Sequence, residues 1–262
     1  MMDSINIGGV PRDATDTRER LIRAGEHLFA RQGVDGARTA DIRKAAGQLN
    51  ESALHYHFGS RQGLLVAIFR KHLEATEPAR RAALAGLTDE SASHDAGDRG
   101  GDRGGVGEGR AELRRVVAAL VGPDAGRLHS PDGRDYLRII VQVAGRAGVQ
   151  QGPARLPVEE TALARVLQRL EAWLTGRLPE PVARERLAAA IGFLTIALAD
   201  RARRIDDGDA LLVDHDTFTG ELVAMITAAM AAAPAQRRDH ALPGGPVAPG
   251  EASRRRRRTG RA

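Results

Sequence analysis

The stretch 49-LNESALHYHFGSRQGLL-65 concentrates side chains that bind metals, transfer protons or form directional hydrogen bonds. The whole chain has eight His and two Tyr residues, and two of the former and one of the latter lie here. Three kinds of chemistry use such residues: a metal site, a catalytic dyad, and a surface that recognises another molecule. The spacing of the residues and the elements that carry them distinguish the three.

Neither a metal site nor a catalytic dyad fits this spacing. On a helix His55 and His57 point about 200° apart, whereas helical zinc ligands are four positions apart. Ser52, His55 and Glu51 lie on one short helix and cannot form a chain of nucleophile, base and orienting group. The chain has no Cys, which excludes thiolate ligands, disulfides and Cys nucleophiles. We therefore expect no metal, no cofactor and no enzymatic activity.

The residues before this stretch are typical of two helices. The sequence 16-DTRE-19 is a helix-start signature, and the apolar residues after it recur at helical spacing. Gly33 favours a helix end, so we expect a first helix near 16–32. Thr39 is predicted to cap a short second helix, which stops at Gly47.

The stretch itself predicts a turn, a short helix and the start of a longer one. Asn50 is a good N-cap for a third helix over 51–57. Leu54 and Phe58, four positions apart, are expected to face inward from it. Ser60 is predicted to cap a fourth helix. Two helices, a tight turn and a further helix within about 60 residues form a helix-turn-helix layout.

The rest of the chain is predicted to be helical, apart from one insertion and the two ends. The segment 94–110 contains DRGG twice and cannot bury apolar surface, so we expect a flexible insertion. Residues 1–15 are expected to form a flexible arm and residues 233–262 a disordered basic tail. No strand-like alternation persists, and we expect an all-α protein. Further helices are predicted at 110–121, 133–147, 159–176, 181–205 and 215–232.

Charge and hydropathy limit the environment of the protein. The net charge is +5, but Arg254 to Arg258 supply five positive charges, so the rest of the chain is near neutral. Overall basicity is therefore weak evidence for nucleic-acid binding. No apolar run reaches membrane-spanning length, and the N-terminus lacks the basic-then-apolar order of a signal peptide. We expect a cytoplasmic protein that does not enter a membrane.

Residues 17–73 resemble the TetR family of transcriptional regulators. Members typically have an apolar first helix ending at Gly, a Thr or Ser opening the second helix, and Ala-Gly closing it. An aromatic recognition helix ending in Phe and a basic residue starting the fourth helix follow. The turn 47-GQLNESALHYHF-58 is one residue longer than the commonest family spacing. The counterparts in this sequence are Phe29, Gly33, Thr39, Ile42, Ala46, Gly47, Tyr56, Phe58 and Arg61.

The resemblance implies a domain scheme and a function. A three-helix helix-turn-helix domain over 16–60 would bind a palindromic operator in double-stranded DNA. A helical-bundle domain over 61–232 would bind a small-molecule effector and form a homodimer through the helices near 159–176 and 181–205. We therefore expect a ligand-responsive repressor. The alternative is a small-molecule-binding or scaffold protein whose helix-turn-helix serves protein contacts.

The predicted DNA contacts are polar side chains on the recognition helix and groups at the neighbouring helix starts. Base edges are read by exposed donors and acceptors, whereas phosphates are bound by cations and N–H groups at helix starts. His57 lies between the inward and outward faces, where we expect phosphate contact. The predicted set is Thr39, Ala40, Arg43, Lys44, Asn50, Glu51, Ser52, His55, Tyr56, His57 and Arg61.

The effector pocket is expected among apolar side chains of the bundle, because pockets between helices are mostly apolar with few polar groups. Ordinary core packing is the alternative for each of these residues. The richness in Ala, Leu and Val favours an apolar or amphipathic ligand. The candidate lining residues are Phe69, Tyr136, Ile139, Ile140, Val143, Trp173 and Phe193.

Overall fold

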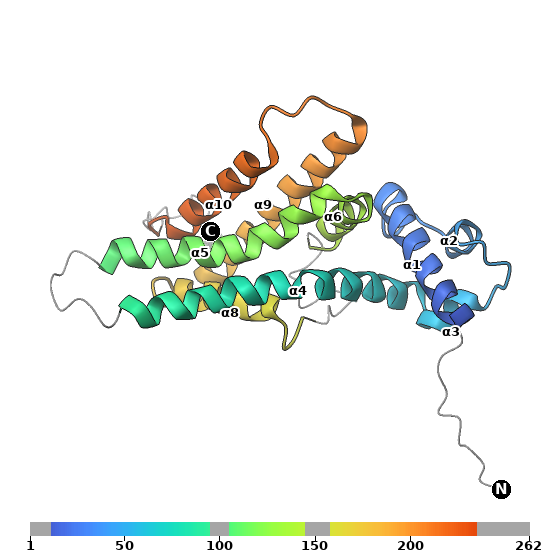
Figure 1. Cartoon of the computed structure of the whole chain (residues 1–262), viewed down its shortest axis with the longest axis horizontal. Coiled ribbons are helices and arrows are strands. Elements are labelled where there is room, and N and C mark those ends of the chain that lie inside the picture. The colour runs from blue at the N-terminus through green and yellow to red at the C-terminus, as the bar shows by residue number, and fades with distance from the viewer. Residues whose placement is uncertain (1–11, 95–104, 145–157, 235–262) are drawn as a thin grey trace, which may run out of the picture. The chain divides into compact units, whose positions relative to one another are not determined.

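The computed structural model describes residues 12–94, 105–144 and 158–234, and these ranges contain helices and no strand. The all-α prediction is confirmed. Figure 1 shows α4 and α5 side by side, with α1 to α3 around the N-terminal end of α4. The elements are α1 (Arg12–Gln32), α2 (Thr39–Ala45), α3 (Ala53–Phe58), α4 (Arg61–His94), α5 (Gly105–Ala125), the 3-10 helix η1 (Gly126–His129), α6 (Pro131–Ala144), α8 (Ala162–Thr175), α9 (Glu180–Asp207) and α10 (His215–Ala231).

The ends of the first two helices follow from local sequence, with two corrections. α1 begins at Arg12 rather than at residue 16, inside the segment expected to be a flexible arm. Its predicted end at Gly33 is confirmed, because φ is +87° there and Gly adopts this left-handed conformation without strain. At α2 the N-cap residue is Arg38. Thr39 is the first helical residue, and no side chain caps the helix.

The helix α3, predicted to be the recognition helix, starts at Ala53, two residues later than predicted, and Asn50 does not cap it. The Oδ1 atom of Asn50 instead accepts a hydrogen bond from the N–H of Ser52 at 2.9 Å, which closes a turn before the helix. The predicted cap of α4 is confirmed. Ser60 Oγ accepts a hydrogen bond from the N–H of Gly63 at 3.0 Å.

α4 passes through Pro78, a residue that disfavours helix interiors. Pro78 and Glu74 are both exposed residues of α4, so water can reach the side of the helix on which Pro78 leaves the Glu74 carbonyl without an N–H partner. The helix carries buried side chains from both hydrophobic clusters, Leu64 near its start and Leu87 further along. α4 therefore runs without interruption from one cluster into the other.

Two hydrophobic clusters form the core of the described residues. One cluster contains residues of α1, α2, α3 and α4, and Tyr136 and Ile139 of α6 belong to it. The larger cluster joins α5, α8, α9 and α10, and Leu137 of α6 belongs to that one. Because α4 and α6 contribute to both clusters, the domain boundary predicted at residue 60 stays a prediction.

The five predicted downstream helices are present, with differences at their ends. α5 begins at Gly105, so residues 105–110 of the expected insertion are helical. The short η1 is an element that the sequence pattern does not predict. Residues 1–11 of the expected arm, 95–104 of the insertion and 235–262 of the tail lie outside the described residues. No described helix is long and apolar enough to cross a membrane.

Candidate functional site

The outward face of α3 carries the side chains predicted to read bases. Tyr56 is 79% exposed and His55 is also exposed. On the opposite face Leu54 is buried in the N-terminal cluster and Phe58 packs against it. These two apolar contacts fix the helix, because residues four apart lie on one side of it. The polar side of α3 is therefore presented to solvent in a fixed orientation.

The other predicted contacts lie around this face. Arg43 is mostly covered, with 16% of its side chain exposed, and its guanidinium lies 4.0 Å from the Glu51 carboxylate. His57 is half-buried, and burial, with the nearby charge of Arg18, lowers its pKa. A neutral ring offers a phosphate a hydrogen bond but no charge. The exposed members of the set are Thr39, Ala40, Lys44, Asn50, Glu51 and Ser52.

Arg61 has partners inside the chain. Its Nη1 donates to the backbone carbonyls of Asp35 at 3.0 Å and Ala37 at 3.1 Å. Its Nη2 lies 3.6 Å from the Asp35 carboxylate. These contacts hold the loop between α1 and α2 against the start of α4. Nη1 of Arg61 is therefore directed at the protein rather than at a phosphate.

Leu49 is an exposed residue that the sequence analysis missed. It is 97% exposed, in the turn between α2 and α3 and directly before Asn50. Turns favour polar residues and Gly, so an apolar side chain in this turn is the signal that identifies it. Apolar side chains contact the thymine methyl group in the major groove.

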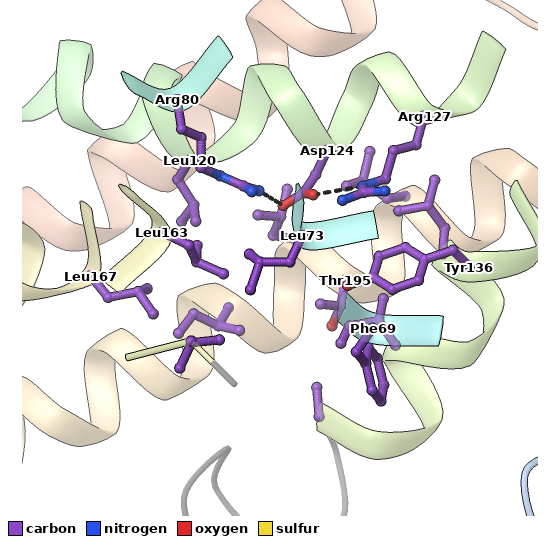
Figure 2. Close-up of a pocket in the computed structure, with 17 residues that line it drawn as sticks. Phe69, Leu73, Arg80, Leu120, Asp124, Arg127, Tyr136, Leu163, Leu167 and Thr195 are labelled. Atoms are coloured by element: carbon purple, nitrogen blue, oxygen red, sulfur yellow. Dashed lines mark hydrogen bonds and ion pairs between the residues drawn. The ribbon is translucent and has the colours of Figure 1, made fainter. Parts of the chain in front are cut away.

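A cavity of about 110 Å³ lies between α4, α5, α6, α8 and α9 (Figure 2). One water molecule requires roughly 10–15 Å³ of such space, so the cavity has room for a small organic molecule. Three of the predicted pocket residues, Phe69, Tyr136 and Ile140, line it. Most of the other lining side chains are apolar, among them Leu73, Leu120, Leu163, Leu167, Leu194 and Leu198.

The other four predicted pocket residues lie elsewhere. Ile139 is fully buried and Val143 packs against the N-terminal cluster, because this face of α6 meets α1. Trp173 packs against the larger cluster and its Nε1 donates to the Gly109 carbonyl at 3.2 Å. Phe193 is 43% exposed on α9. Periodicity identifies an apolar helix face but not which neighbour that face meets.

One wall of the cavity carries charged side chains that the sequence analysis missed. Arg80 is 1% exposed, and its Nη2 donates to the Asp124 carboxylate at 2.7 Å. Arg127 Nε donates to the other oxygen of that carboxylate at 3.0 Å, as Figure 2 shows. Arg80 continues the helical spacing of Leu73 and Leu84 along α4. An Arg at a position where the helical spacing predicts a core residue is therefore the sequence signal that could have identified this charged wall.

The charged wall continues through buried hydrogen bonds to α1. Arg127 Nη1 lies 2.6 Å from His72 Nδ1, and because arginine only donates, Nδ1 accepts. The proton of the neutral ring is therefore on Nε2, which donates to Glu26 of α1 at 2.6 Å. Burial lowers the pKa of His72, which favours this neutral form. We call Glu26, His72, Arg127, Asp124 and Arg80 the buried bridge.

Fold and surface together define the class of protein. Helices packed around Phe29 and Ile42, with an exposed recognition helix after a tight turn, form a helix-turn-helix domain. Residues 21–68 match the family described as "Bacterial regulatory proteins, tetR family". The N-terminal part of the chain is a TetR-family helix-turn-helix domain, and the resemblance found in the sequence is confirmed.

Three solved structures are similar to the chain over most of its length. The HlyIIR mutant protein is 14% identical over 85% of this chain and 98% of that chain, with a TM-score of 0.46. A TetR-family regulator from Streptomyces coelicolor A3 is 18% identical over 86% and 100%, with a TM-score of 0.42. A putative tetR family regulator from Shewanella sp. PV-4 is 17% identical over 81% and 97%, with a TM-score of 0.46. No curated protein sequence matches the chain.

Proposed function

We propose that this protein is a transcriptional repressor that binds a palindromic operator as a homodimer and is released by a small-molecule ligand. The observation that carries the proposal is the outward face of α3 within a TetR-family domain. There Tyr56 and His55 are exposed on a helix fixed by Leu54 and Phe58. A helix presented in this way can place donors and acceptors against base edges in the major groove.

Within this proposal the contacts divide by chemistry. Tyr56 and Asn50 read base edges, and the exposed Leu49 contacts a thymine methyl group. Lys44 and the hydroxyl of Thr39, both exposed on α2, contact phosphates and set the register of α3 on the duplex. Changes at the first group are expected to alter sequence preference, whereas changes at the second weaken binding to all sequences.

The dimer is supported by apolar side chains that the described chain leaves exposed. On α9, Val182, Phe193 and Ile196 are 44%, 43% and 60% exposed, and on α10 Met225 is 45% exposed. In α8, by contrast, none of the large apolar side chains is exposed: Leu170 is fully buried, and Leu163 and Leu167 pack against the larger cluster. Exposed apolar patches mark interaction surfaces. We therefore propose α9 and α10 as the dimer helices, in place of α8, which forms most of the expected 159–176 segment.

Release by a ligand is supported by the buried bridge. It starts at Arg80 and Asp124 on the cavity wall and ends at Glu26 on α1, a helix of the DNA-binding domain. A ligand that changes the contact between Arg80 and Asp124 therefore acts on a hydrogen-bonded chain that holds α1. Such a chain can bias two arrangements of the recognition helices.

The test measures binding of the full chain to the DNA that flanks its own coding region. Fluorescence anisotropy reports the affinity at salt concentrations of about 50 to 200 mM. We expect a complex with one segment that resists a shuffled competitor, and a Tyr56→Ala variant that loses this discrimination while it stays folded. Binding of equal strength to the native and shuffled segments would refute the proposal. That result would favour the small-molecule-binding or scaffold protein instead.

A further inference from the structure

The wall of the cavity contains a hydrogen-bond donor without a partner. Arg80 is 1% exposed, and its Nε–H makes no hydrogen bond within the described part of the chain. Its other nitrogens are used: Nη1 donates to Thr76 Oγ1 at 2.6 Å, and Nη2 donates to Asp124 at 2.7 Å. Buried donors are normally paired, because an unpaired one loses its hydration without compensation.

The same wall carries more positive than negative charge. Arg80 and Arg127 contribute two guanidinium groups and Asp124 one carboxylate, and no other charged residue of the described chain lines the cavity. Further along the bridge, Glu26 is balanced by Lys71, whose Nζ lies 2.8 Å from it. One excess positive charge in a low-dielectric cavity favours an anion over a neutral molecule, and both over a cation.

The remaining surface of the cavity suits an apolar group. Leu163 and Leu167 of α8 and Leu194 and Leu198 of α9 line it. Tyr136 adds a polar group, and burial raises its pKa to about 12, so the phenol keeps its proton and remains able to donate. The cavity thus combines one cationic wall with several aliphatic ones.

We propose that the cavity binds an amphipathic acid, with its carboxylate against the Arg80 guanidinium and its hydrocarbon part among the leucines. The inference rests on the proposed ligand responsiveness and narrows it to one class of ligand. A bound carboxylate accepts the Nε–H of Arg80 and competes with Asp124 for the same guanidinium. Asp124 also holds Arg127, so the ligand acts on the buried bridge at its first contact.

The experiment compares three eight-carbon probes that differ only in the head group: octanoate, 1-octanol and octylammonium. Each is titrated into the DNA-free full chain at pH 7.5, below its micelle concentration, by isothermal titration calorimetry. We expect octanoate to bind at least about tenfold more tightly than octanol, as a charge-assisted hydrogen bond in a buried site implies. Octylammonium should bind most weakly.

Two variants should move this preference in opposite directions. Arg80→Met removes the guanidinium at similar length and should bring octanoate to the affinity of octanol. Asp124→Asn removes the competing carboxylate and should tighten octanoate binding several-fold without tightening octanol. Arg81→Met is the matched control on the same helix, because Arg81 is 63% exposed and paired with Glu77 outside the cavity. It should keep the wild-type preference.

Octanoate that does not bind, equal affinities for octanoate and octanol, or an unchanged preference in Arg80→Met would each overturn the inference. If Arg80→Met does not fold, Asp124→Asn decides, and weaker octanoate binding in that variant counts against the inference. The titrations involve no DNA and so are independent of the operator. If octanoate binds as expected and leaves operator affinity unchanged, the ligand class holds and the proposed release fails.

Discussion

The short helix α3 and the larger helical part of the chain differ in where they place certain polar and apolar residues. In the first, polar residues such as Tyr56 are exposed and apolar ones such as Leu54 are buried. In the second, Arg80 and Arg127 are buried while Phe193 and Ile196 are exposed. Buried charges and exposed apolar groups are the informative departures from the usual distribution. In this protein they mark the proposed ligand site and the proposed dimer face.

The largest effect is expected at the centre of the buried bridge. Arg127→Met leaves Asp124 with Arg80 as its one remaining partner and removes the donor to His72 Nδ1. It should lower the free energy of unfolding by about 3–5 kcal/mol, as removal of one member of a buried charged pair does. Chemical denaturation measures this. Arg203→Met, at an exposed pair with Asp200 and Asp207, is the control and should change little. If both variants lose an equally small amount of unfolding free energy, the buried bridge does not stabilise the fold more than an exposed ion pair does.

The exposed apolar face of α9 gives the next largest effect. Ile196→Asp places a charge in the proposed dimer interface and should yield monomers, with operator affinity lower by roughly 100-fold or more because one half-site is lost. Sedimentation equilibrium and anisotropy measure the two quantities. The matched control is Ala172→Asp on the exposed side of α8. If Ala172→Asp is monomeric and Ile196→Asp stays dimeric, the dimer interface includes the 159–176 segment, as expected from the sequence, and not the exposed face of α9.

On the outward face of α3, Tyr56→Ala should leave stability unchanged because the ring is 79% exposed. We expect it to weaken operator binding by about 1–3 kcal/mol, the worth of a good base contact, and to relax the preference at the contacted base pair. A comparison of single-base operator variants measures the preference. Uniform weakening across all operators would instead place Tyr56 on the DNA backbone.

The contrast between the two regions also explains how much could be predicted from sequence. The helix-turn-helix follows from patterns a few residues long, such as the Gly33 helix end and the apolar pair Leu54 and Phe58. Errors there are local: Asn50 bonds to Ser52 instead of capping α3, because a short polar side chain satisfies either arrangement.

The buried bridge could not be assembled from sequence because its members are distant in the chain. His72 meets Glu26 across 46 positions and Arg127 across 55. A helical pattern shows that Arg80 occupies a core position, but the partner that makes this tolerable is 44 positions away. For the same reason, the sequence could not separate the residues that line the cavity from those that pack in the core. Ile139 and Ile140 are neighbours on α6 and both contact the N-terminal cluster, yet only Ile140 also lines the cavity.

A substitution at Arg61 shows whether this residue of the helix-turn-helix domain stabilises the fold or contacts DNA. Because it holds the Asp35 and Ala37 carbonyls, we expect Arg61→Ala to lower the free energy of unfolding by roughly 1–2 kcal/mol, as loss of charged hydrogen bonds at a partly exposed site implies. The dependence of DNA affinity on salt should stay as in the wild type. A slope reduced by about one unit would establish the phosphate contact expected from the sequence.

The smallest effect is expected from pH, through His72. Glu26 of α1, Arg127 of η1, Lys71 of α4 and the Tyr136 ring of α6 surround it, and burial is the main cause of its lowered pKa. The unfolded chain therefore binds a proton at this His, with a pKa of about 6.5, before the folded protein does. Its contribution to stability is complete above that pH and is lost as the pH falls below it.

We therefore expect thermal stability to fall between pH 7.5 and 5.5, and to fall less in His72→Gln, which keeps polar contacts but does not titrate. The contribution of His72 is the difference between the pH dependence of the wild type and that of His72→Gln. The comparison is needed because burial also lowers the pKa of His57 and His215, so these residues also make the protein less stable at low pH. If His72→Gln and wild type respond to acid alike, the neutral His between Glu26 and Arg127 does not control the bridge.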